Sequence, residues 1–171
     1  METILTAATI LAMYLNLSSN PGSDYAYNAQ IEDGAVKTLQ VYSSEAEMLT
    51  PKLQYSYSYD AEGKVVEKEA QKWNAARSVW EPYYRHAYTY SASGYAVRRT
   101  GWNQRTGRYD LPQGMVSYEV VNGSVTAVNT YTLGQRSLRL CLGRRYPGHE
   151  SGGHAVHGRL HCQVTSPDEL M

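Results

Sequence analysis

Two pairs of closely spaced carboxylates are the first residues whose spacing suggests chemistry. Asp60 lies two residues before Glu62, and Glu67 lies two residues before Glu69. A glycoside hydrolase uses two such groups, one as an acid and the other as a base or nucleophile. Asp60 and Glu62 come directly before Gly63, however, where aspartate favours a turn through hydrogen bonds to its own backbone. Glu67 and Glu69 flank a lysine, which is typical of a solvated strand face, so neither pair predicts catalysis.

Large side chains also recur in pairs seven positions apart, with a proline after each pair. The pairs are Tyr42 with Leu49, Trp73 with Trp80, and Trp102 with Tyr109, and the prolines are Pro51, Pro82 and Pro112. This pattern is typical of cross-strand contacts that close hairpin loops. Amphipathic rings also stack on sugars or on an extended peptide. The candidate ligand-binding residues are therefore Trp73, Trp80, Trp102 and Tyr109, and the alternative is that their rings serve only the packing of the sheet.

Cysteine and histidine gather in the last 37 residues. They are Cys141, His149, His154, His157, His161 and Cys162. Both residue types bind zinc, but no C-x-x-C occurs and the segment is rich in glycine and arginine, so we predict no metal site. A Cys141–Cys162 disulfide would suit an oxidising compartment better. The preferred interpretation is that residues 135–171 are an atypical tail, disordered or translated from a shifted reading frame.

Other signatures of catalysis are missing from the sequence. It contains no G-x-S-x-G, no H-E-x-x-H and no glycine loop of the phosphate-binding type. We therefore predict no enzymatic activity, no catalytic residue and no cofactor. The charges balance at 16 basic and 16 acidic residues, so no net field steers nucleic acid toward the protein, and we expect no nucleic-acid partner.

Four glycines at turn-type sites predict the β-hairpins that position the aromatic pairs. Gly34, Gly63, Gly94 and Gly123 are spaced by 29, 31 and 29 residues, and a valine follows each within three positions. Alternating segments such as Tyr55–Tyr59 precede them, which predicts strand, tight turn and strand in each unit.

A unit of two strands cannot bury a face alone, so neighbouring units must pair edge to edge. We predict an all-β fold of tandem antiparallel β-hairpin repeats, forming a single twisted sheet or a thin curled meander. A small barrel or a two-layer sandwich is the alternative architecture. Period-two alternation places Tyr55, Tyr57 and Tyr59 on one face and the polar residues between them on the other.

An apolar run from Ile4 to Leu15 precedes the repeats and is followed by small polar residues. This pattern is typical of a secretory signal peptide and is too short for a membrane span. The predicted organisation is a signal peptide at 1–19, a linker at 20–23, the repeat domain at 24–134 and the tail at 135–171. It implies a periplasmic or extracellular protein without a membrane span in the mature chain. Glu2 replaces the usual basic residue, so a cytosolic N-terminal helix is the alternative.

The motif Tyr-x-Tyr-x-Tyr-Asp-x-x-Gly at Tyr55–Gly63 and the Trp-Asn pairs at Trp73 and Trp102 resemble a family of small secreted proteins of unknown function from Bacteroides and its relatives. The resemblance covers Met1–Thr132 and includes the segment Asn20–Tyr27. It implies export and a β-rich repeat fold, and it assigns no catalytic residue.

These observations together favour an exported, non-catalytic binding or interaction module that presents an aromatic sheet face to a glycan or a protein. The alternatives are a structural or self-assembling envelope protein and, less favoured, an unrecognised glycoside hydrolase. The sequence leaves the ligand and the oligomeric state open.

Overall fold

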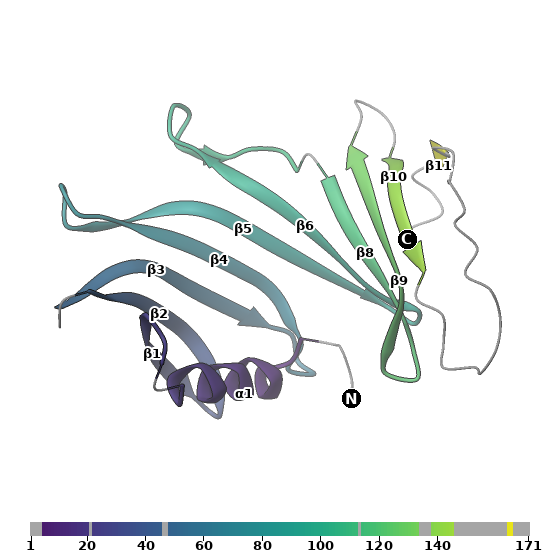
Figure 1. The fold of residues 1–171 in the computed structure, drawn as a ribbon. Helices are drawn as coiled ribbons and strands as arrows, with labels where there is room; N and C mark the ends of the chain where they lie inside the picture. The colour runs from purple at the N-terminus through teal and green to yellow at the C-terminus, as the bar shows by residue number, and fades with distance from the viewer. Residues whose placement is uncertain are drawn as a thin grey trace. The chain divides into compact units, whose positions relative to one another are not determined.

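The computed structural model describes residues 5–20, 22–45, 48–112, 114–133, 138–145 and 164–165. Within these ranges the chain forms one helix, α1 (Ala7–Ser18), and eleven strands (Figure 1). The strands are β1 (Tyr25–Glu32), β2 (Ala35–Glu45), β3 (Met48–Tyr59), β4 (Val65–Asn74), β5 (Val79–Ser91), β6 (Gly94–Asn103), β7 (Arg108–Tyr109), β8 (Gly114–Val121), β9 (Ser124–Leu133), β10 (Leu138–Arg145) and β11 (Val164–Thr165).

The strands follow one another in the sheet in the order in which they occur in the chain. The path runs β1-β2-β3-β4-β5-β6-β8-β9-β10-β11, and the short β7 pairs with β6 beside it. The pairs β1–β2, β2–β3, β3–β4, β4–β5, β6–β8 and β8–β9 are all antiparallel. The predicted fold class, an all-β antiparallel meander of hairpins, is confirmed.

The described chain divides into two compact units. The N-terminal unit comprises residues Leu5–Ala87 and Thr100–Asp110, so it holds α1, the first four strands, most of β5 and the β6–β7 hairpin tip. The C-terminal unit contains Tyr88–Arg99 and the chain from Leu111 onward. All four candidate ligand-binding residues lie in the N-terminal unit.

The turn glycines have the backbone conformation that their positions predict. The β1–β2 hairpin turns at Asp33 and Gly34, with φ of 50° and 74°, and the β8–β9 hairpin turns at Asn122 and Gly123, with φ of 50° and 75°. Two successive residues with positive φ are the signature of a type I′ turn, whose twist matches that of the flanking strands.

The core of the N-terminal unit contains two of the valines that follow turn glycines. Val36 and Val65 are fully buried, and Leu39, Val41 and Ala70 are also buried. Tyr55 on β3 is paired with Leu39 on β2 and with Ala70 on β4. Paired residues share a face of the sheet, and Tyr57 shares the face of Tyr55, so the core lies on the tyrosine side. The alternation predicted for β3 therefore separates a tyrosine face, which holds the core, from a polar face.

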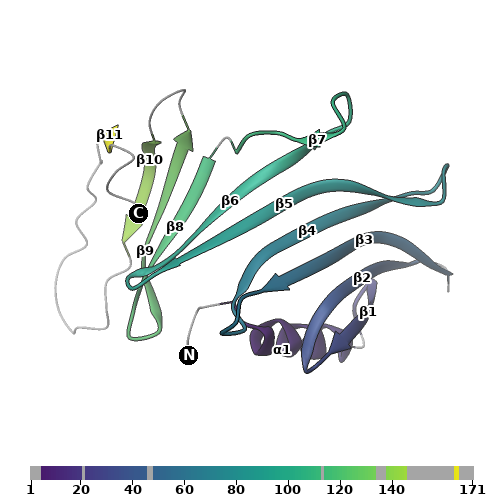
Figure 2. The same ribbon diagram turned by 180° about the vertical axis from the view of Figure 1, so that it is seen from behind.

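Helix α1 packs against β1 and β2 (Figure 2). A capping box between Thr6 and Thr9 begins the helix, and Ile10 is buried beneath it. The amide of Ala7 donates to the carbonyl of Gly63 at 2.8 Å, which ties the start of the helix to the β3–β4 turn. The helix coincides with the run that the sequence predicts to be a leader. No helix among the described residues is both long and apolar enough to cross a bilayer.

One predicted cross-strand pair is wrong. Tyr42 is opposite Pro51, and Leu49 is opposite Ser44, because strand pairing in the β2–β3 hairpin continues as far as Glu45. The other two hairpins end earlier in four-residue turns, each held by an asparagine that follows the first aromatic residue. Ser43 follows Tyr42, so this device is missing and the strands pair further.

The predicted tail is described only in part. Residues 138–145 form β10, which pairs antiparallel with β9, and residues 164–165 form β11. Cys141 therefore belongs to a strand backbone, whereas Cys162 and the four histidines of this segment lie outside the described residues. The alternative Cys141–Cys162 disulfide and residues 1–4 of the predicted signal peptide likewise lie outside the described residues, the former through Cys162.

Candidate binding surface at two aromatic hairpins

Trp73 and Trp80 are the closing pair of the β4–β5 hairpin. They are directly opposite in the register, and their rings meet edge to face with centroids 5.1 Å apart and an interplanar angle of 66°. Both side chains are partly exposed. The predicted cross-strand contact is confirmed here, and it leaves ring surface available to solvent.

Trp102 and Tyr109 close the β6–β7 hairpin in the same manner. They are opposite in the register, with centroids 5.0 Å apart and an interplanar angle of 75°. Both are partly exposed. Aromatic pairs of this geometry stabilise a hairpin by about 0.5–1.5 kcal/mol beyond the area that they bury.

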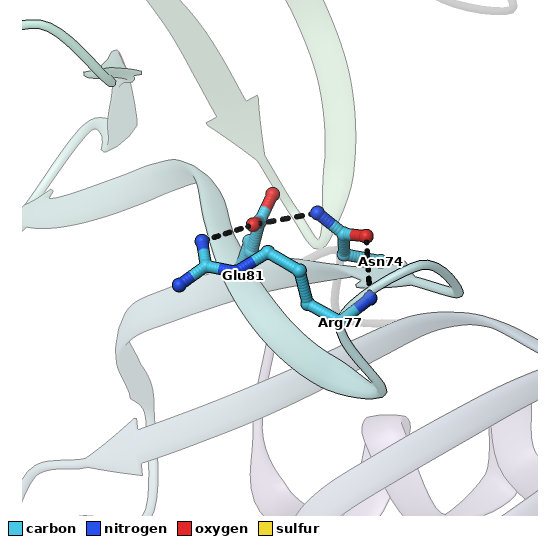
Figure 3. Close-up of polar contacts among 3 residues, drawn as sticks. All are labelled: Asn74, Arg77 and Glu81. Atoms are coloured by element: carbon cyan, nitrogen blue, oxygen red, sulfur yellow. Dashed lines mark hydrogen bonds and ion pairs between the residues drawn. The ribbon is translucent and has the colours of Figure 1, made fainter.

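An asparagine holds the loop of the first hairpin. Asn74 accepts a hydrogen bond from the amide of Arg77 at 3.2 Å and donates to Glu81 Oε1 at 2.8 Å (Figure 3). Arg77 Nη1 reaches the same carboxylate oxygen at 3.1 Å. The three residues form a closed set of polar contacts next to Trp73 and Trp80, through the backbone amide and the guanidinium of Arg77, which fixes the loop and the rings beside it.

The second hairpin repeats this arrangement. Asn103 accepts from the amides of Arg105 and Thr106 at 3.1 and 3.2 Å and donates to Asp110 Oδ1 at 3.0 Å. In both hairpins the asparagine and the acid are seven positions apart, one place after the aromatic pair. The sequence carries this signal in the spacing of asparagine and acid, which the spacing of the aromatic residues alone does not reveal.

Tyr109 connects the second hairpin to the strands of the first. Its hydroxyl donates to Glu69 Oε1 at 2.9 Å, and the guanidinium of Arg85 lies 4.7 Å from its ring centroid. Arg85 Nη1 also pairs with Glu67 Oε2 at 3.4 Å. Burial, followed by the hydrogen bond to Glu69, raises the pKa of Tyr109 well above its usual value, so the hydroxyl remains a donor at neutral pH.

One of the two carboxylate pairs considered for catalysis, Glu67 and Glu69, thus belongs to this cluster. Glu67 and Arg85 keep 37% and 38% of their side-chain surface exposed, so the ion pair is accessible to a ligand. Period-two alternation places Glu67, Glu69, Gln71 and Trp73 on one face of β4. We call these four residues, together with Trp80, Arg85, Trp102 and Tyr109, the aromatic hairpin surface.

A row of amides extends the polar face away from this surface. Gln40, Gln54 and Gln71 are aligned across β2, β3 and β4. Gln40 Nε2 donates to Gln54 Oε1 at 2.8 Å, and Gln54 Nε2 donates to Gln71 Oε1 at 3.3 Å. The polar face is therefore organised by hydrogen bonds between strands as well as by the backbone ladder.

The described residues hold no group of three or more histidine, cysteine, aspartate and glutamate side chains with the geometry of a metal site. What the aromatic hairpin surface offers is rings with exposed edges, two carboxylates, an amide and a guanidinium. Such a combination can stack on a ring and exchange hydrogen bonds with hydroxyl groups.

Known proteins resemble the chain in sequence and in fold. The model of a family of unknown function, DUF3836, matches residues 1–119. A DUF3836 family protein from Bacteroides vulgatus is 31% identical over 57% of this chain and 100% of its own, with a TM-score of 0.54. A protein of unknown function from Bacteroides fragilis is 24% identical over 75% of this chain and 96% of its own, with a TM-score of 0.64, and supports the fold alone. Among curated proteins, no sequence matches the chain.

Proposed function

Because the chain belongs to DUF3836, a family of unknown function, we propose a function from its own geometry: it is an exported, non-catalytic protein whose aromatic hairpin surface binds a glycan. The observation that carries the proposal is the position of Tyr109. It links Trp102 to Glu69 and Arg85, so two aromatic pairs and a set of polar groups form one surface.

The chemistry of this surface suits a sugar. Trp73 lies four residues from Glu69 on β4, which corresponds to about 13 Å along a strand. A linear glycan could stack on Trp73 and Trp102 while its hydroxyls exchange hydrogen bonds with the carboxylates of Glu67 and Glu69 and with the guanidinium of Arg85. A few polar groups among apolar rings are typical of sites that orient a small ligand.

Retention on a polysaccharide affinity gel, preceded by a glycan array to choose the polysaccharide, tests the proposal. We expect Trp102→Ala to weaken retention at least about tenfold, or ~1.4 kcal/mol, because it removes one of the partly exposed rings on which a sugar would stack. Tyr25→Ala is the matched control, because Tyr25 is an exposed aromatic residue on β1 outside this surface. It should leave retention unchanged.

Thermal unfolding of each variant separates lost binding from lost structure, and Trp102→Phe, which keeps a ring, should retain binding. Tryptophan fluorescence that no glycan on the panel alters, together with equal retention of Trp102→Ala and the parent chain, would contradict the proposal. A concentration-dependent oligomer without any retention would instead favour the self-assembly alternative.

A further inference from the structure

A groove lies on the tyrosine face, on the opposite side of the sheet from the aromatic hairpin surface. Its volume is about 840 Å³, and it is bounded by α1 and by β1 to β4. This volume is within the range of about 300–1,000 Å³ that small-molecule sites occupy. The apolar part of its floor is formed by Leu39, Val41 and Leu53.

Lys68 lines this groove and forms no ion pair with a described carboxylate. Lys68 Nζ lies 3.9 Å from the ring centroid of Tyr55 and 5.9 Å from that of Tyr57. The described residues supply no carboxylate that pairs with it, and burial lowers its pKa. Its two sequence neighbours, Glu67 and Glu69, point to the other face of β4. The electrostatics of this position favour an anion from outside the chain.

Ser43 lines the same groove and carries a hydroxyl group without a hydrogen-bond partner among the described residues. Ser43 is 4% exposed, and its Oγ is buried. A buried hydroxyl without a hydrogen-bond partner is destabilising, so a ligand that supplies a partner gains affinity. Ser43 follows Leu39 by four positions on β2, or about 13 Å along the strand.

We propose that the groove binds a single-chain amphiphile with a carboxylate head group. The carboxylate pairs with Lys68, the hydrocarbon chain lies over Leu39, Val41 and Leu53, and a polar group near the far end of the chain hydrogen-bonds to Ser43. Lys52 and Asp24 also line the groove but are exposed to water, so the partly buried Lys68 selects the head group, and the apolar floor selects the chain.

The polar contacts of this site come from strands and not from α1. Lys68, Ser43 and the apolar floor all belong to strands, whereas the helix contributes Met13 and Leu17, which are 51% and 39% exposed. The groove volume and the burial of Ser43 apply to the chain that keeps α1, which is the full chain used in the test below.

Calorimetric titration of the full chain with dodecanoate, dodecanol and ω-hydroxydodecanoate tests the inference. Dodecanoate should bind at least about tenfold more tightly than dodecanol, because the alcohol offers Lys68 no charge. Lys68→Met should remove this preference by weakening dodecanoate alone. Lys72→Met is the matched control, because Lys72 lies on the same face of β4, over the Tyr83 ring at 5.7 Å, but does not line the groove.

The hydroxyl is tested by the third ligand. ω-Hydroxydodecanoate should bind more tightly than dodecanoate to the parent chain, and Ser43→Ala should abolish that difference. Equal binding of dodecanoate and dodecanol to the parent chain would overturn the inference, and so would a preference that survives Lys68→Met. The comparison of ligands on the parent chain needs no variant, so it remains decisive if a substitution disturbs folding.

Discussion

Single asparagines decide how two of the hairpins close. Asn74 and Asn103 each accept backbone amides of the loop that follows and donate to an acid seven positions later. These side-chain contacts add to a backbone hydrogen bond in each turn, from Arg77 to Asn74 and from Gly107 to Asn103, and they keep the aromatic pairs at the strand ends in register.

At this scale we expect Asn103→Ala to lower the free energy of unfolding by about 1 kcal/mol, because three hydrogen bonds of an exposed loop are lost. The amides of Arg105 and Thr106 should exchange faster with solvent, since both donate to the Asn103 side chain. Gln104→Ala, at an exposed position in the same loop, is the control and should change neither quantity. Unaltered exchange at both amides in Asn103→Ala would contradict the role of this residue.

The sequence predicts some of these residues and misses others for a physical reason. The aromatic pairs Trp73–Trp80 and Trp102–Tyr109 follow from spacing, since both members lie at loop ends in one chain segment. The contact of Tyr109 with Glu69 joins residues 40 positions apart, and no local pattern contains it. Lys68 and Ser43 likewise become notable only once burial is known.

The close approach of strands β6 and β8 requires a glycine at one position of β6. Gly94 has φ of 149°, and a Cβ at this position would overlap the carbonyl of Tyr118 on β8. The neighbouring rings of Tyr95 and Tyr118 stack with centroids 4.6 Å apart, so the two strands lie in close contact at this level.

We expect Gly94→Ala to destabilise the protein by at least about 2 kcal/mol, because the methyl group must displace a backbone carbonyl and φ enters a strained region. Gly101→Ala is the matched control on the same strand, since a Cβ there has no heavy atom within 4 Å. It should change stability by less than about 0.5 kcal/mol. Chemical denaturation measures both, and equal stability of the two variants would show that β8 yields easily to the added methyl group.

Element types were more predictable than element register. The glycine and valine landmarks locate the hairpins correctly, because a turn and the strand after it are local features. The pairing of Tyr42 with Pro51 depends on an irregularity between Val41 and Tyr42, and bulges of this kind leave no periodic trace in a sequence. The packing of α1 on β1 and β2 was also not predicted, because the apolar run favours a leader, although a packed helix has the same pattern.

For the whole molecule, processing of the N-terminus is the test of export. In a bacterium that secretes the full chain, we expect the intact mass of the exported protein to correspond to cleavage near residue 19. Leu11→Arg should block export, because a charge in the apolar run prevents its insertion into the secretion machinery. Asn20→Arg, beyond the run, should not block it. Recovery of the uncleaved chain from the cytosol alone would support α1 as a permanent part of the fold, as its buried Ile10 would then suggest.

The strand order has a consequence for how the molecule forms. From β1 to β6, each strand pairs with the next one in the chain, so every pairing needs the closure of a short loop only. Short loops keep contact order low and lessen the kinetic delay that usually slows all-β folding. A hairpin can therefore form as soon as its second strand leaves a ribosome or a secretion channel, and each later strand adds to the edge that the previous one left exposed.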